Sequence, residues 1–196
     1  MKLIYFSVVL ICLTYSIESK KLLIFQKDLY TNLDKYKNLF KTPNTTIDVM
    51  INKFTYPKKR YDGFIIPGGN SSIIDRTTEY WKFVDFVLKT NKPVFAICLG
   101  FQHVIKYYVP HIIQEKCDMV NLIVENKMHN HKWCVSNYYT NELYKRFYLD
   151  YYMYENKLYI GVIENDHIIG TIFHPEKQIK LTALENVLLE KFFNML

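Results

Sequence analysis

From residue 21 to residue 108, short apolar runs alternate with segments whose apolar residues recur at helical spacing. Four of the runs are short enough for buried strands, and they cover residues 21–25, 46–51, 64–66 and 93–97. The helical segments between and after them cover residues 29–40, 80–89 and 101–108. Strands that alternate with helices form βαβ units. The pattern therefore predicts an α/β fold with three layers, α/β/α, around a mostly parallel central sheet.

After residue 110 the pattern becomes richer in strands. Strand-like runs cover residues 120–124, 133–136, 159–163 and 168–173. The sequence Glu-Asn-Asp-His at residues 164–167 predicts a tight hairpin turn between the last two of these strands. Helical spacing returns over residues 184–193 and predicts one further helix.

The first 19 residues are not needed by this order of elements. Lys2 is followed by an apolar run over residues 3–15, then by small residues and the pair Lys20–Lys21, which is typical of a secretory signal peptide. The alternative is that residues 3–10 form the first strand, but no helix could then connect them to a parallel neighbour at residue 21. We therefore expect a signal peptide over residues 1–19, followed by one hydrolase domain over residues 20–196.

This leader predicts a secreted or lysosomal/vacuolar protein, with no membrane attachment of the mature form. The protein would be cytoplasmic if the leader is not cleaved. In an exported protein Cys117 and Cys134 could pair, which would leave Cys98 as the free thiol once Cys12 is removed with the leader.

Composition says little more about the fold, but it limits the kinds of partner that the protein is expected to bind. The chain has 196 residues, 49% of them hydrophobic, which suits one domain with a sizeable core. Its net charge of +6 is spread along the sequence, as in many soluble proteins, and it also suits attraction of a polyanionic substrate. The tyrosines are scattered through apolar runs, so nucleic-acid binding is not expected. His129, His131 and Cys134 lack a further ligand cluster nearby in the sequence, so neither a metal nor another cofactor is expected.

Cys98 is the first candidate for chemistry. It follows the predicted strand 93–97 and precedes Gly100 and a predicted helix, as a nucleophile does at a sharp strand-to-helix turn. The helix N-terminus would favour the thiolate. Taken alone, Cys98 would more often be a buried structural cysteine, so its assignment depends on other residues at the same sheet edge.

Two further motifs follow predicted strands. In His-Pro-Glu, His174 is placed to take the thiol proton and Glu176 to orient the imidazole ring. In Pro-Gly-Gly, the N–H groups of Gly68 and Gly69 would stabilise an oxyanion together with the N–H of Leu99. The three motifs together predict a Cys-His-Glu hydrolase.

These motifs resemble those of the class I glutamine amidotransferase superfamily. The Pro-Gly-Gly loop at residues 67–69, the Cys-x-Gly-x-Gln turn at 98–102 and the His-Pro-Glu segment at 174–176 occur in the same order. The resemblance extends over residues 21–196. It implies a flavodoxin-like fold and hydrolysis of a glutamine-type side-chain amide through a γ-glutamyl thioester.

Within this superfamily, residues 130–136 and 141–147 look like the corresponding region of γ-glutamyl hydrolases, peptidase family C26. In those secreted or lysosomal enzymes a His-Lys-Trp segment supplies a second histidine beside the substrate. The resemblance implies that His131, Trp133 and Gln102 bind the substrate. It also implies cleavage of γ-glutamyl amide bonds, as in folate poly-γ-glutamates.

The alternative is a glutaminase subunit that delivers ammonia to a synthase partner. Gln102 favours it, because the hydrolases tend to carry Glu there, and the chain is shorter than those enzymes. A binding module without activity is a third interpretation, which the intact Cys98, His174 and Glu176 disfavour. The expected partner is a small γ-glutamyl substrate, and a homodimer is left open.

Overall fold

The computed structural model describes residues 18–26, 33–69 and 73–196. The predicted signal peptide therefore lies almost entirely outside the described residues. None of the described helices is long and apolar enough to cross a membrane.

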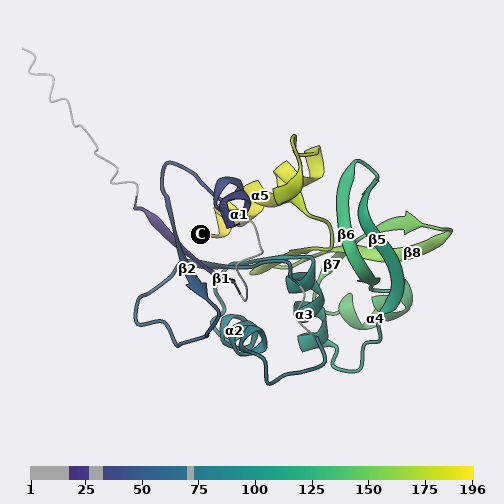
Figure 1. Ribbon diagram of the computed structural model, residues 1–196, viewed down its shortest axis with the longest axis horizontal. Coiled ribbons are helices and arrows are strands. Elements are labelled where there is room, and N and C mark those ends of the chain that lie inside the picture. Colours follow the sequence, from purple (N-terminus) through teal and green to yellow (C-terminus); the bar gives the residue numbers. More distant parts are fainter. Residues whose placement is uncertain (1–17, 27–32, 70–72) are drawn as a thin grey trace, which may run out of the picture.

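A seven-stranded sheet forms the centre of the domain (Figure 1). The strands lie side by side in the order β2 (Thr45–Ile51), β1 (Lys20–Gln26), β3 (Gly63–Ile66), β4 (Val94–Ile97), β9 (Ile168–Thr171), β8 (Lys157–Glu164) and β7 (Tyr148–Tyr154). The first five strands are parallel, and β8 and β7 are antiparallel to their neighbours. The predicted mostly parallel sheet is thus confirmed.

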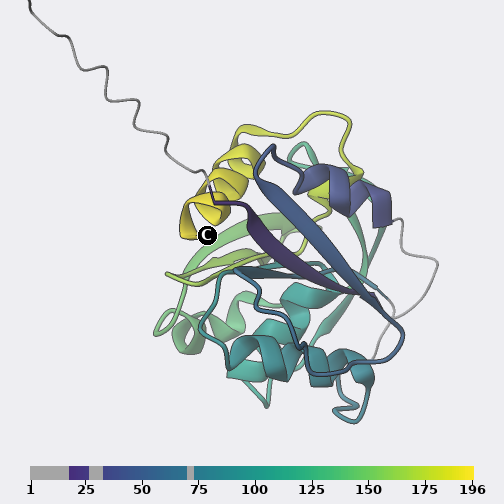
Figure 2. The ribbon, with the colours of Figure 1, turned by 90° about the vertical axis from the view of Figure 1, so that its left-hand side faces the viewer.

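Helices cover both faces of the sheet (Figures 1 and 2). One face carries α1 (Leu33–Leu39) and α5 (Ala183–Met195), and the other carries α2 (Glu79–Leu88) and α3 (Leu99–Tyr108). The three-layer α/β/α prediction is therefore correct. The helix predicted from residue 29 is described only from Leu33 onward.

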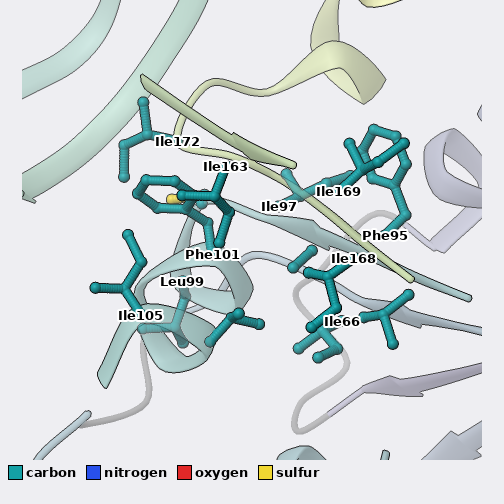
Figure 3. Close-up of a cluster of buried hydrophobic side chains, with 14 of the residues drawn as sticks. Ile66, Phe95, Ile97, Leu99, Phe101, Ile105, Ile163, Ile168, Ile169 and Ile172 are labelled. Atoms are coloured by element: carbon teal, nitrogen blue, oxygen red, sulfur yellow. The ribbon is translucent and has the colours of Figure 1, made fainter. Parts of the chain in front are cut away.

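The central strands are buried on both faces, as expected for parallel strands between two helical layers. Figure 3 shows how side chains of β3, β4, β8 and β9 pack with those of α3 in one apolar cluster. Its labelled members include Ile66, Phe95, Ile97, Leu99, Phe101, Ile105, Ile163 and Ile169. This packing fixes the start of α3 against the ends of the central strands.

A separate two-stranded hairpin, β5 (Glu115–Val124) and β6 (Lys127–Cys134), lies beside the sheet. The sequence pattern placed a strand at residues 133–136, whereas β6 ends at Cys134 and begins at Lys127. The difference arises because the buried side chains of β6 include Lys127, His129 and His131, which hide its apolar alternation.

Strand β7 and the short helix α4 (Thr140–Leu143) were not predicted. A recurring dipeptide marks the missed hairpins: Glu125–Asn126 joins β5 to β6, and Glu155–Asn156 joins β7 to β8. All four residues have positive φ, between 47° and 62°, as two-residue hairpin turns require. The predicted turn at residues 164–167 is confirmed, since the Asn165 N–H donates to the Ile168 carbonyl at 2.9 Å.

The first turn of α3 approaches β3 so closely that only glycine fits at residue 100. A Cβ atom on Gly100 would overlap the Ile66 carbonyl oxygen. We expect Gly100→Ala to lower the free energy of unfolding by roughly 1–3 kcal/mol, the usual cost of overpacking, measured by urea denaturation. Gly69→Ala is the matched control, because a Cβ there would lie 3.5 Å from Leu99 Cδ2, an ordinary contact. Equal unfolding midpoints for the two variants would contradict the expectation.

Candidate active site

Three neighbouring parallel strands end at one edge of the sheet. Strand β3 leads into Pro-Gly-Gly, β4 leads into Cys98, and β9 leads toward His174. Because β3 pairs with β4 and β4 with β9, their carboxyl ends meet at this edge. The three motifs predicted to act together are therefore brought together by the sheet.

Cys98 has the backbone geometry of a sharp strand-to-helix turn. Its φ of 50° and ψ of −101° are strained for a residue with a side chain, at a cost of about 1–3 kcal/mol. Two hydrogen bonds hold the turn: the Cys98 N–H donates to the Thr171 carbonyl at 2.7 Å, and the Gln102 N–H donates to the Cys98 carbonyl at 3.0 Å. Cys98 is a free cysteine, only 4% exposed, at the N-terminus of α3.

His174 is buried beside Cys98 and paired with Glu176. Its Nδ1 lies 2.6 Å from Glu176 Oε1, and both side chains are almost fully buried. A carboxylate at this distance accepts the Nδ1 proton, which leaves the lone pair of the neutral ring on Nε2. Nε2 has no hydrogen-bond partner among the described oxygen and nitrogen atoms. It is therefore available to take a proton from the neighbouring thiol.

The charges around His174 favour its protonated form. Burial by itself lowers the pKa of His174, but the neighbouring Cys98 and Glu176 outweigh burial and raise the pKa well above its usual range. A protonated His174 can stabilise negative charge on the neighbouring sulfur, and it carries the proton that a leaving group needs.

Gly68 lies close to both His174 and Cys98. A Cβ atom placed on Gly68 would lie 3.0 Å from His174 Cε1 and 3.5 Å from Cys98 Cβ. The Gly68 N–H donates to the Tyr36 hydroxyl at 3.0 Å. Of the three predicted oxyanion donors, Gly69 and Leu99 remain to donate their N–H groups, and their side chains adjoin, with Leu99 Cδ2 3.5 Å from a Cβ placed on Gly69.

Two tyrosines hold the Pro-Gly-Gly loop, and the sequence pattern indicates neither role. Besides the bond from Gly68 to Tyr36, the Tyr80 hydroxyl donates to the Pro67 carbonyl. Burial and the neighbouring Glu176 raise the pKa of Tyr36 well above its usual value, so the hydroxyl stays protonated. The helical spacing predicts that Tyr36 and Tyr80 belong to the core. It does not indicate that their hydroxyl groups form hydrogen bonds to a loop.

A cavity of about 790 Å³ opens beside Cys98, within the range of sites for drug-sized ligands. The hairpin β5–β6 contributes one wall, and α3 with the segment after it contributes another. Its lining includes Gly69, Leu99, Gln102, Lys106, Ile112, His131, Lys132 and Trp133. Among the described residues, no carboxylate lines this cavity.

The three predicted substrate-binding residues all line the cavity but also bind one another. Gln102 Nε2 donates to the Trp133 carbonyl at 3.2 Å, and the same carbonyl lies 3.2 Å from His131 Nδ1. His131 Nε2 lies 3.0 Å from His129 Nδ1. Burial, followed by the neighbouring His129, lowers the pKa of His131 to about 3, so the ring is neutral. This network joins the hairpin to α3, the helix that begins at the candidate nucleophile.

A disulfide between Cys117 and Cys134 closes the hairpin at its open end. The sequence left open whether Cys117 and Cys134 pair; the structure joins them and leaves Cys98 as a free thiol. Cys117 lies where the β5–β6 ladder is interrupted, between the pairs Lys116–Trp133 and Met119–His131, and Cys134 pairs with Glu115 just outside this interruption. The disulfide thus adds a covalent cross-link next to an irregular part of the ladder.

A family model described as glutamine amidotransferase class-I matches residues 29–195. The chain belongs to the class I glutamine amidotransferase family. No curated protein sequence matches this amidotransferase-like chain.

Solved structures agree with this assignment at the level of the fold. A GMP synthase subunit from Thermoplasma acidophilum is 15% identical, with a TM-score of 0.63 over 91% of this chain and 94% of its own. A glutamine amidotransferase from Thermotoga maritima is also 15% identical, with a TM-score of 0.56 over 90% and 91% of the two chains. PurLQS from Thermotoga maritima is 14% identical, with a TM-score of 0.53 over 91% and 97%.

Cys98→Ala is expected to abolish turnover without unfolding the protein. The Cys98 side chain is small and buried, and backbone hydrogen bonds hold the turn in which it lies. Iodoacetamide should label Cys98 in the native protein, since the other described cysteines form a disulfide. Mass spectrometry of labelled peptides and an amidase assay measure the two effects. Substantial turnover by Cys98→Ala would rule out the nucleophile.

His174→Asn and Glu176→Ala separate the base from the residue that orients it. We expect His174→Asn to lose nearly all activity, because Nε2 is the acceptor placed beside the thiol. Glu176→Ala should lose less, since the ring remains and only its orientation and proton affinity change. Steady-state rates with each variant measure the difference. Near-wild-type rates for both would show that the His-Pro-Glu segment serves only the fold.

Proposed function

We propose that this protein hydrolyses γ-glutamyl amide bonds, with Cys98 as nucleophile, His174 as base and Glu176 orienting His174. The thiolate attacks the γ-carbonyl, and the N–H groups of Gly69 and Leu99 receive the oxyanion. His174 then protonates the leaving amine, which yields a γ-glutamyl thioester. A water molecule, deprotonated by His174, releases the acid and regenerates the thiol.

The observation that carries this proposal is the charge of the cavity beside Cys98. Lys106 and Lys132 line it, while no carboxylate does so among the described residues. Lys106 donates to the Ile112 carbonyl, and Lys132 is exposed and forms no ion pair with a described residue. Cationic side chains without acidic ones suit a substrate that carries several carboxylates and no free ammonium group near them.

Free glutamine and an acylated γ-glutamyl chain differ in this respect. Glutamine carries an α-ammonium group, which a carboxylate partner would stabilise. In a γ-linked polyglutamate the α-amino group of each residue after the first is acylated, so only carboxylates remain to be bound along the chain. The cavity volume of about 790 Å³ also leaves room beyond a single glutamyl group. Both features favour a γ-glutamyl hydrolase over a glutaminase that serves a synthase.

The disulfide supports the proposal of a secreted or lysosomal protein. Disulfides persist in oxidising compartments and are rare in the cytosol, and Cys117–Cys134 closes the hairpin that forms one cavity wall. The predicted leader and this cross-link therefore favour the same compartment.

We expect the isolated protein to cleave γ-linked di- or polyglutamate faster than it releases ammonia from glutamine. Lys132→Gln should raise KM for a triglutamyl substrate roughly threefold with kcat unchanged. An exposed charge contributes between a few tenths and about 1 kcal/mol of binding free energy, and this contribution is the same in the ground state and the transition state. Product analysis by chromatography and an ammonia assay measure the two reactions.

Lys180→Gln is the matched control, because Lys180 is exposed but does not line the cavity. Its KM should equal that of the wild type. Glutaminase activity that appears only with an added synthase, together with no cleavage of γ-glutamyl chains, would decide for the ammonia-delivering alternative.

A further inference from the structure

The open end of the β5–β6 hairpin gathers three buried side chains with metal-ligating atoms. His131 Nδ1 lies 3.6 Å from Cys117 Sγ and 3.8 Å from Cys134 Sγ. The three ligand atoms lie within 4.8 Å of one another, and all three side chains are buried. No acidic group belongs to this described cluster.

These nitrogen–sulfur distances match a tetrahedral zinc site. With Zn–S of about 2.3 Å and Zn–N of about 2.0–2.1 Å, tetrahedral angles place nitrogen and sulfur about 3.6 Å apart. Both observed distances lie near this value. The two sulfur atoms would have to separate to about 3.8 Å once the bond between them is broken.

We propose that reduction of the Cys117–Cys134 disulfide turns this end of the hairpin into a zinc site with Cys117, Cys134 and His131 as ligands. A dithiol reductant transfers two electrons and two protons to the disulfide and becomes a disulfide itself. Zn²⁺ then displaces both thiol protons to solvent. Two thiolates and a neutral imidazole leave the site with no net charge, which suits its buried position.

The surroundings supply the outer partners that such a site needs. A ligating histidine commonly donates its other ring N–H to a nearby acceptor. His131 Nε2 lies 3.0 Å from His129 Nδ1, which can accept that proton. His131 also lines the cavity, so water can complete four-coordination from that side. When His131 Nδ1 binds the metal, the Trp133 carbonyl loses its contact with this nitrogen but keeps its hydrogen bond from Gln102.

The consequence is a hairpin that is closed in either redox state. In an oxidising compartment the disulfide joins β5 to β6, and in a reducing one the metal joins the same residues. The cavity wall that carries Lys132 and Trp133 is held in both cases. The zinc site goes beyond the proposed hydrolase activity and does not depend on it.

The test uses the full chain with Cys12→Ser and Cys98→Ser, which retains only Cys117 and Cys134 as cysteines. After anaerobic reduction, we expect it to bind one equivalent of Co²⁺ with thiolate-to-cobalt charge-transfer absorption that Zn²⁺ abolishes. The oxidised protein should bind none. Absence of stoichiometric metal binding by the reduced protein would overturn the proposal.

Two histidine variants in this background identify the third ligand. His131→Asn should weaken zinc affinity at least tenfold, measured by competition with a chromophoric chelator. His111→Asn is the matched control, because His111 lines the cavity but pairs with Glu142, and its zinc affinity should not change. Equal affinities in all three proteins would exclude His131 as a ligand. Circular dichroism detects unfolding on reduction, and a chain that zinc does not refold would also count against the site.

Discussion

Parallel pairing of β4 with β9 joins two segments that lie far apart in the chain, and the candidate site depends on it. The register pairs Ile97 with Thr171, and the Cys98 N–H continues the ladder by donating to the Thr171 carbonyl. This bond holds Cys98 in its strained turn while β9 carries the chain on toward His174. Because β3 lies on the other side of β4, the same edge also receives the glycine loop. The proposed nucleophile, base and oxyanion donors thus share one rigid support.

The β5–β6 hairpin forms a separate sheet, but hydrogen bonds connect it to the segments that carry the candidate site. The His174 N–H donates to the Met128 carbonyl of β6, and Gln102 donates to the Trp133 carbonyl of the same strand. One bond holds the backbone of the candidate base, and the other reaches the helix that follows the candidate nucleophile. A displacement of the cavity wall would therefore also displace these two candidate residues.

The sequence was sufficient for the layers of the fold, because continuous apolar runs and helical spacing are strong signals in buried βαβ units. It also predicted that Cys98 and His174 lie at one sheet edge, since motifs at the ends of neighbouring strands must meet. It was insufficient for β6 and β7, whose polar and tyrosine-rich faces lack clean alternation. The loop-holding hydroxyl of Tyr36 was missed as well, because a contact across 32 residues leaves no local pattern.

The hairpin enters and leaves the domain between α3 and α4, without contributing a strand to the seven-stranded sheet. Its length can therefore change by insertion or deletion at the Glu125–Asn126 turn without shifting the register of any central strand. The register of the central strands and the reach of the hairpin are thus encoded in separate stretches of the chain. In descendants of this sequence, selection could extend the hairpin at its turn, provided that the Met128 carbonyl keeps its hydrogen bond from the His174 N–H.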